Sequence, residues 1–461
     1  MLGPITFTLN GTPRRLPAGT SPTMTLLDWL RGPAGLTGTK EGCAEGDCGA
    51  CTVVMEWPNG ARVPVNACLT LMGQVHGGCV RTVEGLRGPD GAPHPVQTAL
   101  AEADATQCGF CTPGIVMTGW AHARSGPEAG DVHDALAGNL CRCTGYRPIV
   151  AAFRTFRDDG AASPSPPADV ATRLEAPGQV FHRPGSLAEL LRLRAALPEA
   201  WLLAGGTDLG LRVSERREAP PAVICVLDVP ELTGLEETPQ GLRVGAAVPY
   251  RRLLEAITED PGGEYRPLIG LLRRLGSRQI RGLGTLGGNL GTASPIGDAL
   301  PSLVALGATL RLEGPEGTRE MAVEDFLTGY RTHALAPAEV IRDVFLPRPP
   351  RGAIWACEKV SKRPDQDIAT VGMSALITLS DWRVTDARIA LGGTGPRVER
   401  CPPAEAALIG HPWSEETVEA AAAALEATIR PMSDFRAGAE YRRVVAGNLL
   451  RRLWHRSAGE P

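Results

Sequence analysis

The sequence lacks the features that would place it at a membrane or on nucleic acid. It has no run of about eighteen apolar residues, the length that a membrane-spanning helix requires. Its first ten residues show no basic segment followed by an apolar stretch, so we expect no secretory leader. Its formal net charge is −4, so we expect no nucleic-acid partner. Together these absences predict a cytoplasmic protein without membrane association.

Disulfides are rare in a reducing compartment, so the twelve cysteines need another explanation. Four of them form a first set with the spacing C-x4-C-x2-C and a distant fourth member: Cys43, Cys48, Cys51 and Cys68. This is the spacing of plant-type ferredoxins, in which four thiolates hold one [2Fe–2S] cluster. Glycines between these cysteines let backbone amides fold around the sulfurs. A structural zinc site is the alternative, although zinc ribbons usually pair two C-x2-C motifs.

A second cysteine set reads C-x2-C followed later by C-x-C, and it consists of Cys108, Cys111, Cys141 and Cys143. The surrounding residues are predicted to be helical, and helix N-termini favour anionic thiolates. Two clusters in one chain would form a route for single electrons. The other four cysteines are expected to be small buried apolar residues: Cys79, Cys225, Cys357 and Cys401.

The length of 461 residues exceeds what one hydrophobic core usually supports, and the pattern predicts a multidomain α+β protein. The segment Ala-Ala-Ser-Pro-Ser-Pro-Pro at 161–167 favours a semi-rigid spacer. We expect a β-rich domain at 1–84, a helical domain at 85–157, a linker at 158–180, an α+β domain at 181–347 and a C-terminal domain at 348–461.

Apolar periodicity places the main elements. Alternation predicts a strand at 5–9, and Asn10-Gly11 predicts a hairpin turn after it. Further strands are expected at 51–56, 62–65 (after a turn at 58–60), 201–204, 223–227, 242–245, 369–379 and 384–391. Helices are expected at 25–30, 96–102, 114–124, 187–197, 415–429 and 440–453.

Two glycine-rich loops lie in the middle of the chain, Gly-Gly-Thr-Asp at 205–208 and Gly-Thr-Leu-Gly-Gly-Asn at 284–289. Backbone amides exposed by adjacent glycines can cradle a pyrophosphate, while two ordinary tight turns are the alternative. A G-x-G-x-x-G pattern also begins at Gly282. We reject a Rossmann fold, because residues 268–281 before it are predicted to be helical and no acidic residue follows at the expected distance.

Several strings resemble the molybdenum hydroxylases of the xanthine dehydrogenase family. They are EGCAEGDCGAC at 41–51, NAC at 66–68, QCGFCTPGIVM at 107–117, NLCRCTGYRP at 139–148, LLAGGTDL at 202–209, TLGGN with ASPIGD at 285–298 and EKVSKR at 358–363. The chain is similar to the small subunit that fuses the iron–sulfur and FAD parts in bacterial members. The resemblance implies a β-grasp ferredoxin-like domain, an all-α [2Fe–2S] domain, a two-part FAD-binding α+β domain of the vanillyl-alcohol-oxidase type and an α+β C-terminal flavoprotein domain.

The resemblance also implies a role for particular residues. The first cysteine set matches the ligands of the ferredoxin-like cluster, and the second set matches those of the helical-domain cluster, which lies nearer the molybdenum in this family. Gln107 matches a residue that contacts the pterin cofactor. The FAD-binding positions match Leu202, Leu203, Ala204, Gly205, Gly206, Thr207, Asp208, Leu209, Leu275, Thr285, Leu286, Gly287, Gly288, Asn289, Asp298, Ile341 and Lys359. Lys359 is one of only three lysines in the chain.

The resemblance implies an NAD-dependent oxidoreductase that works with a separate, larger molybdopterin-bearing subunit in an α2β2 arrangement. Electrons would pass from the partner's molybdenum through two [2Fe–2S] clusters to FAD and on to NAD⁺, while hypoxanthine and xanthine are oxidised to urate. FAD is needed because clusters take single electrons whereas NAD⁺ takes a hydride. No side chain of this chain is expected to act as an acid or base on the substrate. The alternatives are oxidation of an aldehyde, an N-heterocycle or carbon monoxide, dioxygen as the acceptor, or a zinc-stabilised interaction protein.

Overall fold

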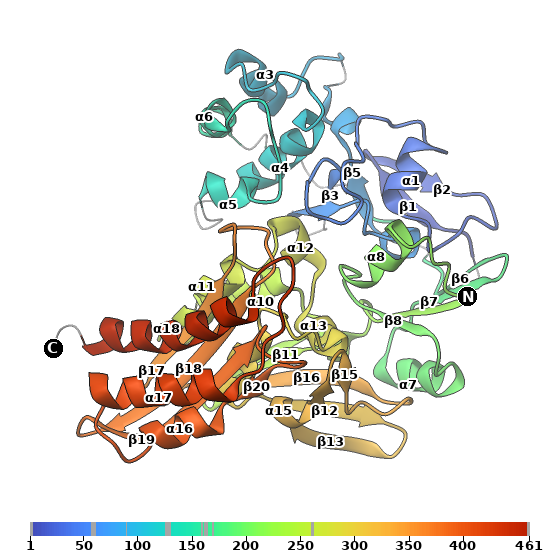
Figure 1. Cartoon of the computed structure of the whole chain (residues 1–461). Helices are drawn as coiled ribbons and strands as arrows, with labels where there is room; N and C mark the ends of the chain where they lie inside the picture. Colours follow the sequence, from blue (N-terminus) through green and yellow to red (C-terminus); the bar gives the residue numbers. More distant parts are fainter. Residues whose placement is uncertain are drawn as a thin grey trace. The chain divides into compact units, whose positions relative to one another are not determined.

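The computed structural model describes residues 3–56, 61–88, 90–124, 131–157, 160, 165–167, 170–259 and 262–458. It divides into two compact units, whose elements are coloured along the sequence in Figure 1. Unit 1 comprises Met1–Val229 and Gly276–Gly284, and unit 2 comprises Pro230–Leu275 and Thr285–Pro461. A short segment from the middle of the chain therefore folds with the N-terminal half.

A five-stranded sheet forms the N-terminal part of unit 1. Its strands are β1 (Thr6–Leu9), β2 (Thr12–Arg15), β3 (Thr52–Glu56), β4 (Arg62–Asn66) and β5 (Cys79–Arg81), in the order β2-β1-β5-β3-β4. Helices α1 (Leu26–Arg31) and α2 (Met72–Val75) accompany it. Asn10 and Gly11 both have a positive φ, as a two-residue hairpin turn requires, which confirms the predicted hairpin. The turn expected at 58–60 lies outside the described residues.

Helices form the next part of unit 1. They are η1 (Val83–Leu86), α3 (Pro95–Glu102), α4 (Thr112–Arg124), α5 (Val132–Leu136) and α6 (Arg147–Phe153), in agreement with the predicted helices. Trp120 of α4 is buried, and the guanidinium carbon of Arg62 lies 3.7 Å from its ring centroid. This cation–π contact joins the helices to β4.

A four-stranded sheet completes unit 1. Its strands are β6 (Arg173–Ala176), β7 (Gln179–His182), β8 (Trp201–Leu203) and β9 (Ala222–Cys225), in the order β6-β7-β9-β8, with helices α7 (Leu187–Ala196) and α8 (Leu209–Ser214). Strand β6 falls within the segment expected to be a linker. Leu174 is buried between exposed neighbours and pairs with Phe181, so this local alternation decides the structure despite the proline-rich residues before it.

Unit 2 begins with an antiparallel five-stranded sheet. Its strands are β10 (Leu235–Thr238), β11 (Gly241–Gly245), β12 (Thr309–Gly314), β13 (Gly317–Ala322) and β16 (Val340–Pro347), in the order β10-β11-β16-β12-β13. The short pair β14 (Leu327–Gly329) and β15 (Thr332–His333) lies nearby in the chain. The accompanying helices are α9 (Pro230–Thr233), α10 (Tyr250–Thr258), α11 (Arg266–Arg273), α13 (Leu286–Thr292), α14 (Leu300–Leu306) and α15 (Val323–Phe326).

The helix expected over 268–281 is interrupted. Helix α11 ends at Arg273, and a new helix, α12 (Arg278–Leu283), begins after Gly276, whose φ is +53°. A positive φ cannot continue a right-handed helix, so the glycine separates the two segments. The later helix belongs to unit 1, whereas α11 belongs to unit 2.

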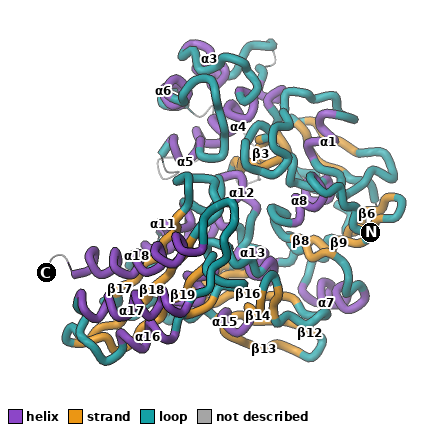
Figure 2. The backbone as a smooth tube through the Cα atoms, in the orientation of Figure 1, coloured by secondary structure: helices purple, strands orange, loops and turns teal. Residues whose placement is uncertain are grey.

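A second antiparallel sheet forms the C-terminal part of unit 2 (Figure 2). Its strands are β17 (Ile354–Val360), β18 (Val371–Ser380), β19 (Arg383–Gly392) and β20 (Glu399–Arg400), followed by helices α16 (Pro402–Leu408), α17 (Glu415–Thr428) and α18 (Ala439–Ala458). Ala375 and Ile377 pack against these helices, while Leu376 packs into the core that contains α14. The sheet is therefore buried on both faces, and the expected strands and helices of this part are confirmed.

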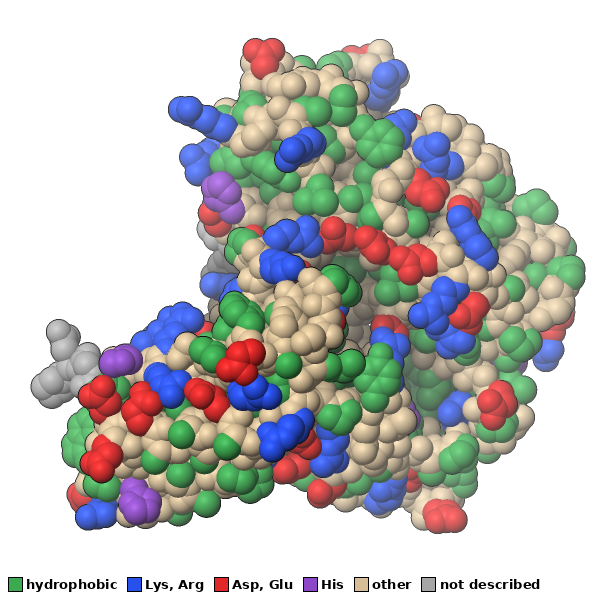
Figure 3. All heavy atoms as spheres, viewed as in Figure 1, with side chains coloured by type: hydrophobic (Ala, Val, Ile, Leu, Met, Phe, Trp, Pro, Cys, Tyr) green, Lys and Arg blue, Asp and Glu red, His purple; other side chains and the backbone are tan. Residues whose placement is uncertain are grey.

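Charged side chains of both signs cover the C-terminal helices (Figure 3). Arg451 of α18 lies 2.8 Å from carboxylate oxygens of Glu419 and Glu426 on α17. These pairs tie the two helices together at a solvent-facing surface. Throughout the described ranges, every helix is too short or too polar to span a bilayer.

Candidate functional site

The first cysteine set lies in the loop between α1 and β3, together with Cys68 just after β4. The Sγ atoms of Cys51 and Cys68 are 3.3 Å apart, and both residues are buried. Cys43 Sγ accepts from the backbone amide of Cys48 over 3.3 Å and from the thiol of the same residue. The structure thus brings the four cysteines that the spacing singled out together as two pairs, Cys43 with Cys48 and Cys51 with Cys68.

These four thiols form two hydrogen-bonded pairs. The hydrogen bond from Cys48 lowers the pKa of Cys43 to about 5, and the hydrogen bond from Cys68 lowers the pKa of Cys51. The same bonds raise the pKa of each donor thiol. In each pair the donor thiol stabilises the thiolate of its neighbour, and ligation of both sulfurs to a metal would displace the donor's proton.

This pairwise arrangement fits a two-iron cluster better than a single zinc ion. A zinc ion needs four ligands around one point, whereas these sulfurs lie as two pairs, Cys43 with Cys48 and Cys51 with Cys68. In a [2Fe–2S] cluster each iron takes two thiolates. Gly42 leaves room for the sulfur of Cys48, since a Cβ there would lie 2.7 Å from Cys48 Sγ.

The second cysteine set lies at the start of α4 and in the loop between α5 and α6. Burial, with a hydrogen bond to Cys141, raises the pKa of Cys111 to about 12. Cys108 and Cys143 are exposed, and so is the neighbouring Gln107. This set therefore opens onto the surface of unit 1, whereas half of the first set is buried.

The remaining four cysteines stand apart from both sets. Cys79, Cys225 and Cys401 are buried, and Cys357 is half-buried. Burial raises the pKa of Cys225 to about 11, which keeps its thiol protonated. They behave as small apolar residues, as expected.

The first glycine loop joins β8 to α8 in unit 1. Gly206 has a φ of +75°, and a Cβ at Gly205 would overlap the carbonyl oxygen of Leu283, so neither position accepts a side chain. Among the described residues, the amides of Gly205, Gly206 and Thr207 donate to no protein group. Three free amides in a tight turn form a nest that suits an anion such as a pyrophosphate.

The second glycine loop starts α13 in unit 2. Thr285 caps this helix, and its Oγ1 accepts from the amide of Gly288 over 2.9 Å. Further along, Lys359 Nζ lies 2.6 Å from Asp298 Oδ2, and their side chains are 1% and 11% exposed. Burial raises the pKa of Asp298 despite this pairing. The pair is therefore a buried ion pair, which structures retain only with good geometry.

Two buried oxygens in this part of unit 2 lack a donor among the described residues, Asn289 Oδ1 and Asp298 Oδ1. Buried polar atoms are normally hydrogen-bonded, so each is an acceptor that a donor from a bound group or a water would satisfy. The hydroxyl groups and ring N–H of a flavin nucleotide are donors of this kind. Leu275 and Ile341 belong to the apolar core of unit 2 and are 9% and 8% exposed, so they can offer only apolar contact.

Arg274 is a residue that the sequence did not single out. Its guanidinium donates to the carbonyl oxygens of Lys359 and Pro364 over 2.8 and 3.2 Å, and its own carbonyl accepts from Lys359 Nζ over 3.1 Å. It therefore holds the strand end that carries the lysine. No motif or local spacing marks this role.

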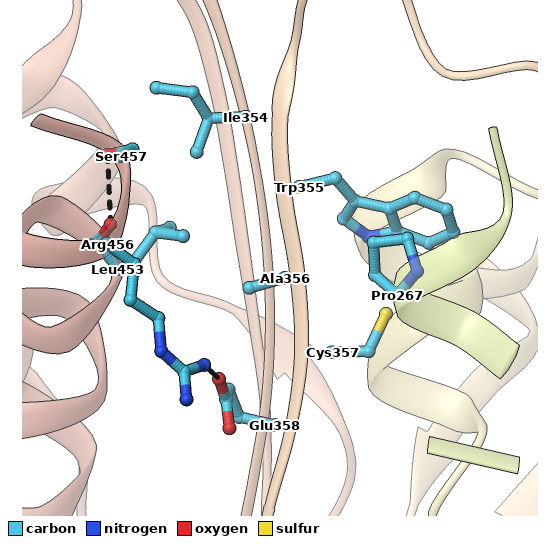
Figure 4. A pocket seen from close by; sticks show the side chains of 9 residues that line it. All are labelled: Pro267, Ile354, Trp355, Ala356, Cys357, Glu358, Leu453, Arg456 and Ser457. Atoms are coloured by element: carbon cyan, nitrogen blue, oxygen red, sulfur yellow. Dashed lines mark hydrogen bonds and ion pairs between the residues drawn. The ribbon is translucent and has the colours of Figure 1, made fainter. Parts of the chain in front are cut away.

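A separate cavity of about 390 Å³ lies along β17 (Figure 4). Trp355 and Cys357 point toward α11, while Glu358 on the other side pairs with Arg456 of α18 over 2.6 Å. None of the expected site residues lines this cavity. We therefore do not assign the site to it.

Four family models match successive parts of the chain. They are a 2Fe-2S iron-sulfur cluster binding domain at 7–73, a [2Fe-2S] binding domain at 82–154, an FAD binding domain in molybdopterin dehydrogenase at 168–349 and a CO dehydrogenase flavoprotein C-terminal domain at 356–457.

Curated relatives and solved structures agree with these models. The xanthine dehydrogenase/oxidase of Felis catus is 32% identical over 96% of this chain and 38% of its own length. Xanthine dehydrogenase 2 of Arabidopsis thaliana is 34% identical over 88% of this chain and 36% of its own length. The structure of carbon monoxide dehydrogenase from Hydrogenophaga pseudoflava, which lacks the Mo-pyranopterin moiety, aligns with a TM-score of 0.56 and 31% identity, over 59% of this chain and 94% of that chain.

The fold and the two cysteine sets define an iron–sulfur flavoprotein with two [2Fe–2S]-binding domains and an FAD-binding domain. The chain belongs to the molybdenum hydroxylase family, of which it forms the iron–sulfur and FAD electron-transfer part. It spans a little over a third of the length of the curated relatives described above. The expected multidomain α+β architecture, the molybdenum hydroxylase family, and the two [2Fe–2S] and FAD cofactors are therefore confirmed.

Proposed function

We propose that the chain passes electrons from a molybdopterin-bearing partner subunit through two [2Fe–2S] clusters to FAD and on to NAD⁺, during oxidation of hypoxanthine and xanthine. When bound, these groups supply the one- and two-electron chemistry that the route needs. The observation that carries the proposal is a contact between the two cysteine loops in unit 1. The amide of Leu140, next to Cys141, donates to the carbonyl of Cys48 over 2.9 Å. This backbone hydrogen bond places the loop of the first cysteine set directly against the loop of the second.

The exposure of the second set supports entry of electrons there. Cys108 and Cys143 are exposed, and Phe110 beside them is 49% exposed. An apolar ring and open thiols suit contact with a partner that carries the electron donor. We propose that Gln107, which lies in the same exposed loop, contacts the partner's pterin.

Contacts of the first set support exit toward the flavin. Gln74 Nε2, shortly after Cys68, donates over 3.1 Å to the carbonyl of Ala204, the residue directly before the first glycine loop. A Cβ at Gly210 would lie 2.5 Å from the carbonyl oxygen of Leu69, the residue after Cys68. The first cysteine set therefore adjoins the segment that we propose holds the FAD pyrophosphate.

The proposed ligands follow from these positions. Each [2Fe–2S] cluster takes one cysteine set, and the proposed FAD-binding positions are the first glycine loop in unit 1 and, in unit 2, the second glycine loop with Asp298 and Lys359. Leu275 and Ile341 contribute apolar contact. The chain's own residues bind and orient these groups, and we assign no acid or base on the organic substrate to them.

Metal and flavin analysis of the purified chain tests the cofactor part. We expect about four irons with matching acid-labile sulfide, since each cluster holds two irons, and about one FAD per chain. Zinc without acid-labile sulfide would refute the cluster assignment.

Co-purification with its partner, followed by assay with hypoxanthine and NAD⁺, tests the rest of the proposal. The xanthine dehydrogenases among the relatives favour a purine substrate. Aldehyde oxidase 2 of Cavia porcellus is 32% identical over 87% of this chain, so an aldehyde is the second candidate. Activity with an aldehyde or carbon monoxide and none with hypoxanthine would refute the purine assignment.

A further inference from the structure

A buried polar network joins the two cysteine loops of unit 1. Besides the hydrogen bond from Leu140 to Cys48, Asn139 Nδ2 donates to the carbonyl oxygen of Gly49 over 3.1 Å. Asn139 lies two residues before Cys141, and Gly49 directly follows Cys48. A change in these contacts therefore changes the spacing between the two cysteine sets.

Glycines allow the loops to approach this closely. A Cβ at Gly49 would overlap the carbonyl oxygen of Gly138, and a Cβ at Gly114 would overlap that of Gly49. The backbones of the two loops and of α4 are therefore in direct contact. Such an interface has no room for side chains and depends on a few hydrogen bonds for its geometry.

Gln279 of α12 completes the network from a distant part of the sequence. Its side-chain amide donates to Asn139 Oδ1 and to Thr52 Oγ1, each over 3.1 Å. Thr52 Oγ1 in turn donates to the carbonyl oxygen of Gly49 over 2.7 Å. Gln279, Asn139 and Thr52 are at most 2% exposed, so water does not replace a lost partner easily.

Helix α12 is held in place independently of Gln279. Arg278 and Arg281 lie 2.8 and 2.7 Å from the carboxylate oxygens of Asp134 on α5. Ile280 packs against the core of the first sheet. A variant that alters only Gln279 should therefore keep α12 docked.

We propose that Gln279 is a positioning residue that fixes the separation of the two [2Fe–2S] clusters, an inference that rests on the proposed function. Its amide orients both Asn139 and Thr52, whose side chains converge on the carbonyl of Gly49. Without Gln279, Asn139 Oδ1 keeps only its hydrogen bond from Thr118, so fewer contacts hold the Asn139 amide against Gly49. The contact between the loops then loosens.

The test is Gln279→Met in the full chain, which keeps the length of the side chain and removes both donors. Anaerobic dithionite makes both clusters paramagnetic, and their magnetic dipoles split each other's EPR signals by an amount that falls with the cube of their distance. We expect wild-type iron content and two cluster signals, with a changed splitting. We also expect faster amide hydrogen exchange in the peptide that contains Leu140, which does not depend on activity.

Two further variants complete the design. Thr52→Val keeps the shape of the side chain but removes the hydroxyl that links Gln279 to the carbonyl of Gly49. It should shift the splitting in the same way even if Gln279→Met folds poorly. Asp134→Asn weakens the anchor of α12 but leaves the network intact, so the wild-type splitting should persist.

The outcomes separate the two proposals. Unchanged splitting and unchanged exchange in Gln279→Met would overturn the positioning role. Loss of a cluster in that variant would overturn it as well, since the residue would then serve cluster retention. A wild-type chain without cluster signals would instead overturn the proposed function, and the inference with it.

Discussion

Replacement of Lys359 by methionine should destabilise unit 2 strongly, because it leaves Asp298 buried without its counter-ion. Lys359 is 1% exposed and Asp298 11% exposed, and their charged atoms are 2.6 Å apart. Removal of one partner from a buried ion pair costs about 3–5 kcal/mol. Urea unfolding followed by circular dichroism measures this loss.

The loss should depend on pH. Burial raises the pKa of Asp298 in the folded state above its ordinary value of 3.8. The stability that such a group contributes is therefore present below the unfolded pKa and is lost as the pH rises through the folded pKa. The Lys359 ammonium opposes this loss of stability, because it favours the charged form of Asp298. In Lys359→Met the Asp298 carboxyl therefore takes up a proton on folding. The deficit of Lys359→Met should therefore grow as the pH rises above the ordinary Asp298 pKa of 3.8 and should shrink as the pH falls toward it.

Two comparisons make this result interpretable. Arg456→Met breaks the neighbouring pair with Glu358, in which the arginine is 55% exposed, and it should cost only about 0–1 kcal/mol. Lys359→Met combined with Asp298→Asn should recover most of the loss, because no charge then stays buried. A loss below about 1 kcal/mol for Lys359→Met, or one that does not change with pH, would refute the reasoning.

Three other outcomes are expected. Cys43→Ser should lower the iron content from about four to about two per chain, and it should slow reduction of FAD by substrate but not by NADH in stopped-flow measurements; equal slowing of both contradicts the route. Gly49→Ala should destabilise both cysteine loops, because its Cβ would overlap the carbonyl of Gly138, and iron analysis should show cluster loss; full iron content argues against the tight loop contact. Arg62→Met should lower the free energy of unfolding of unit 1 by about 0.5–2 kcal/mol through loss of its contact with Trp120, as urea unfolding will show; no loss would mean that the cation–π contact contributes nothing.

Local features of the sequence predicted much of the fold and of the site. The hairpin at Asn10 depends on two adjacent residues with positive φ, and the first cysteine set is largely contained in one short loop, so both leave a local signature. Gln279 leaves none, because it contacts Thr52 across 227 residues and acts through a tertiary hydrogen bond. Arg274 and strand β6 were missed for related reasons: one acts through backbone carbonyls, and the other is a short alternation after a proline-rich stretch.

The contribution of α12 to unit 1 sets an order of events during synthesis. Gln279 follows its partner Asn139 by 140 residues, which a ribosome translates in about 7–28 s. All eight cysteines of the two sets have already been translated by then, but the hydrogen bonds from Gln279 to Asn139 and Thr52 cannot yet form. The nascent chain therefore passes through an interval in which both cysteine sets are complete but Gln279 does not yet hold Asn139 and Thr52.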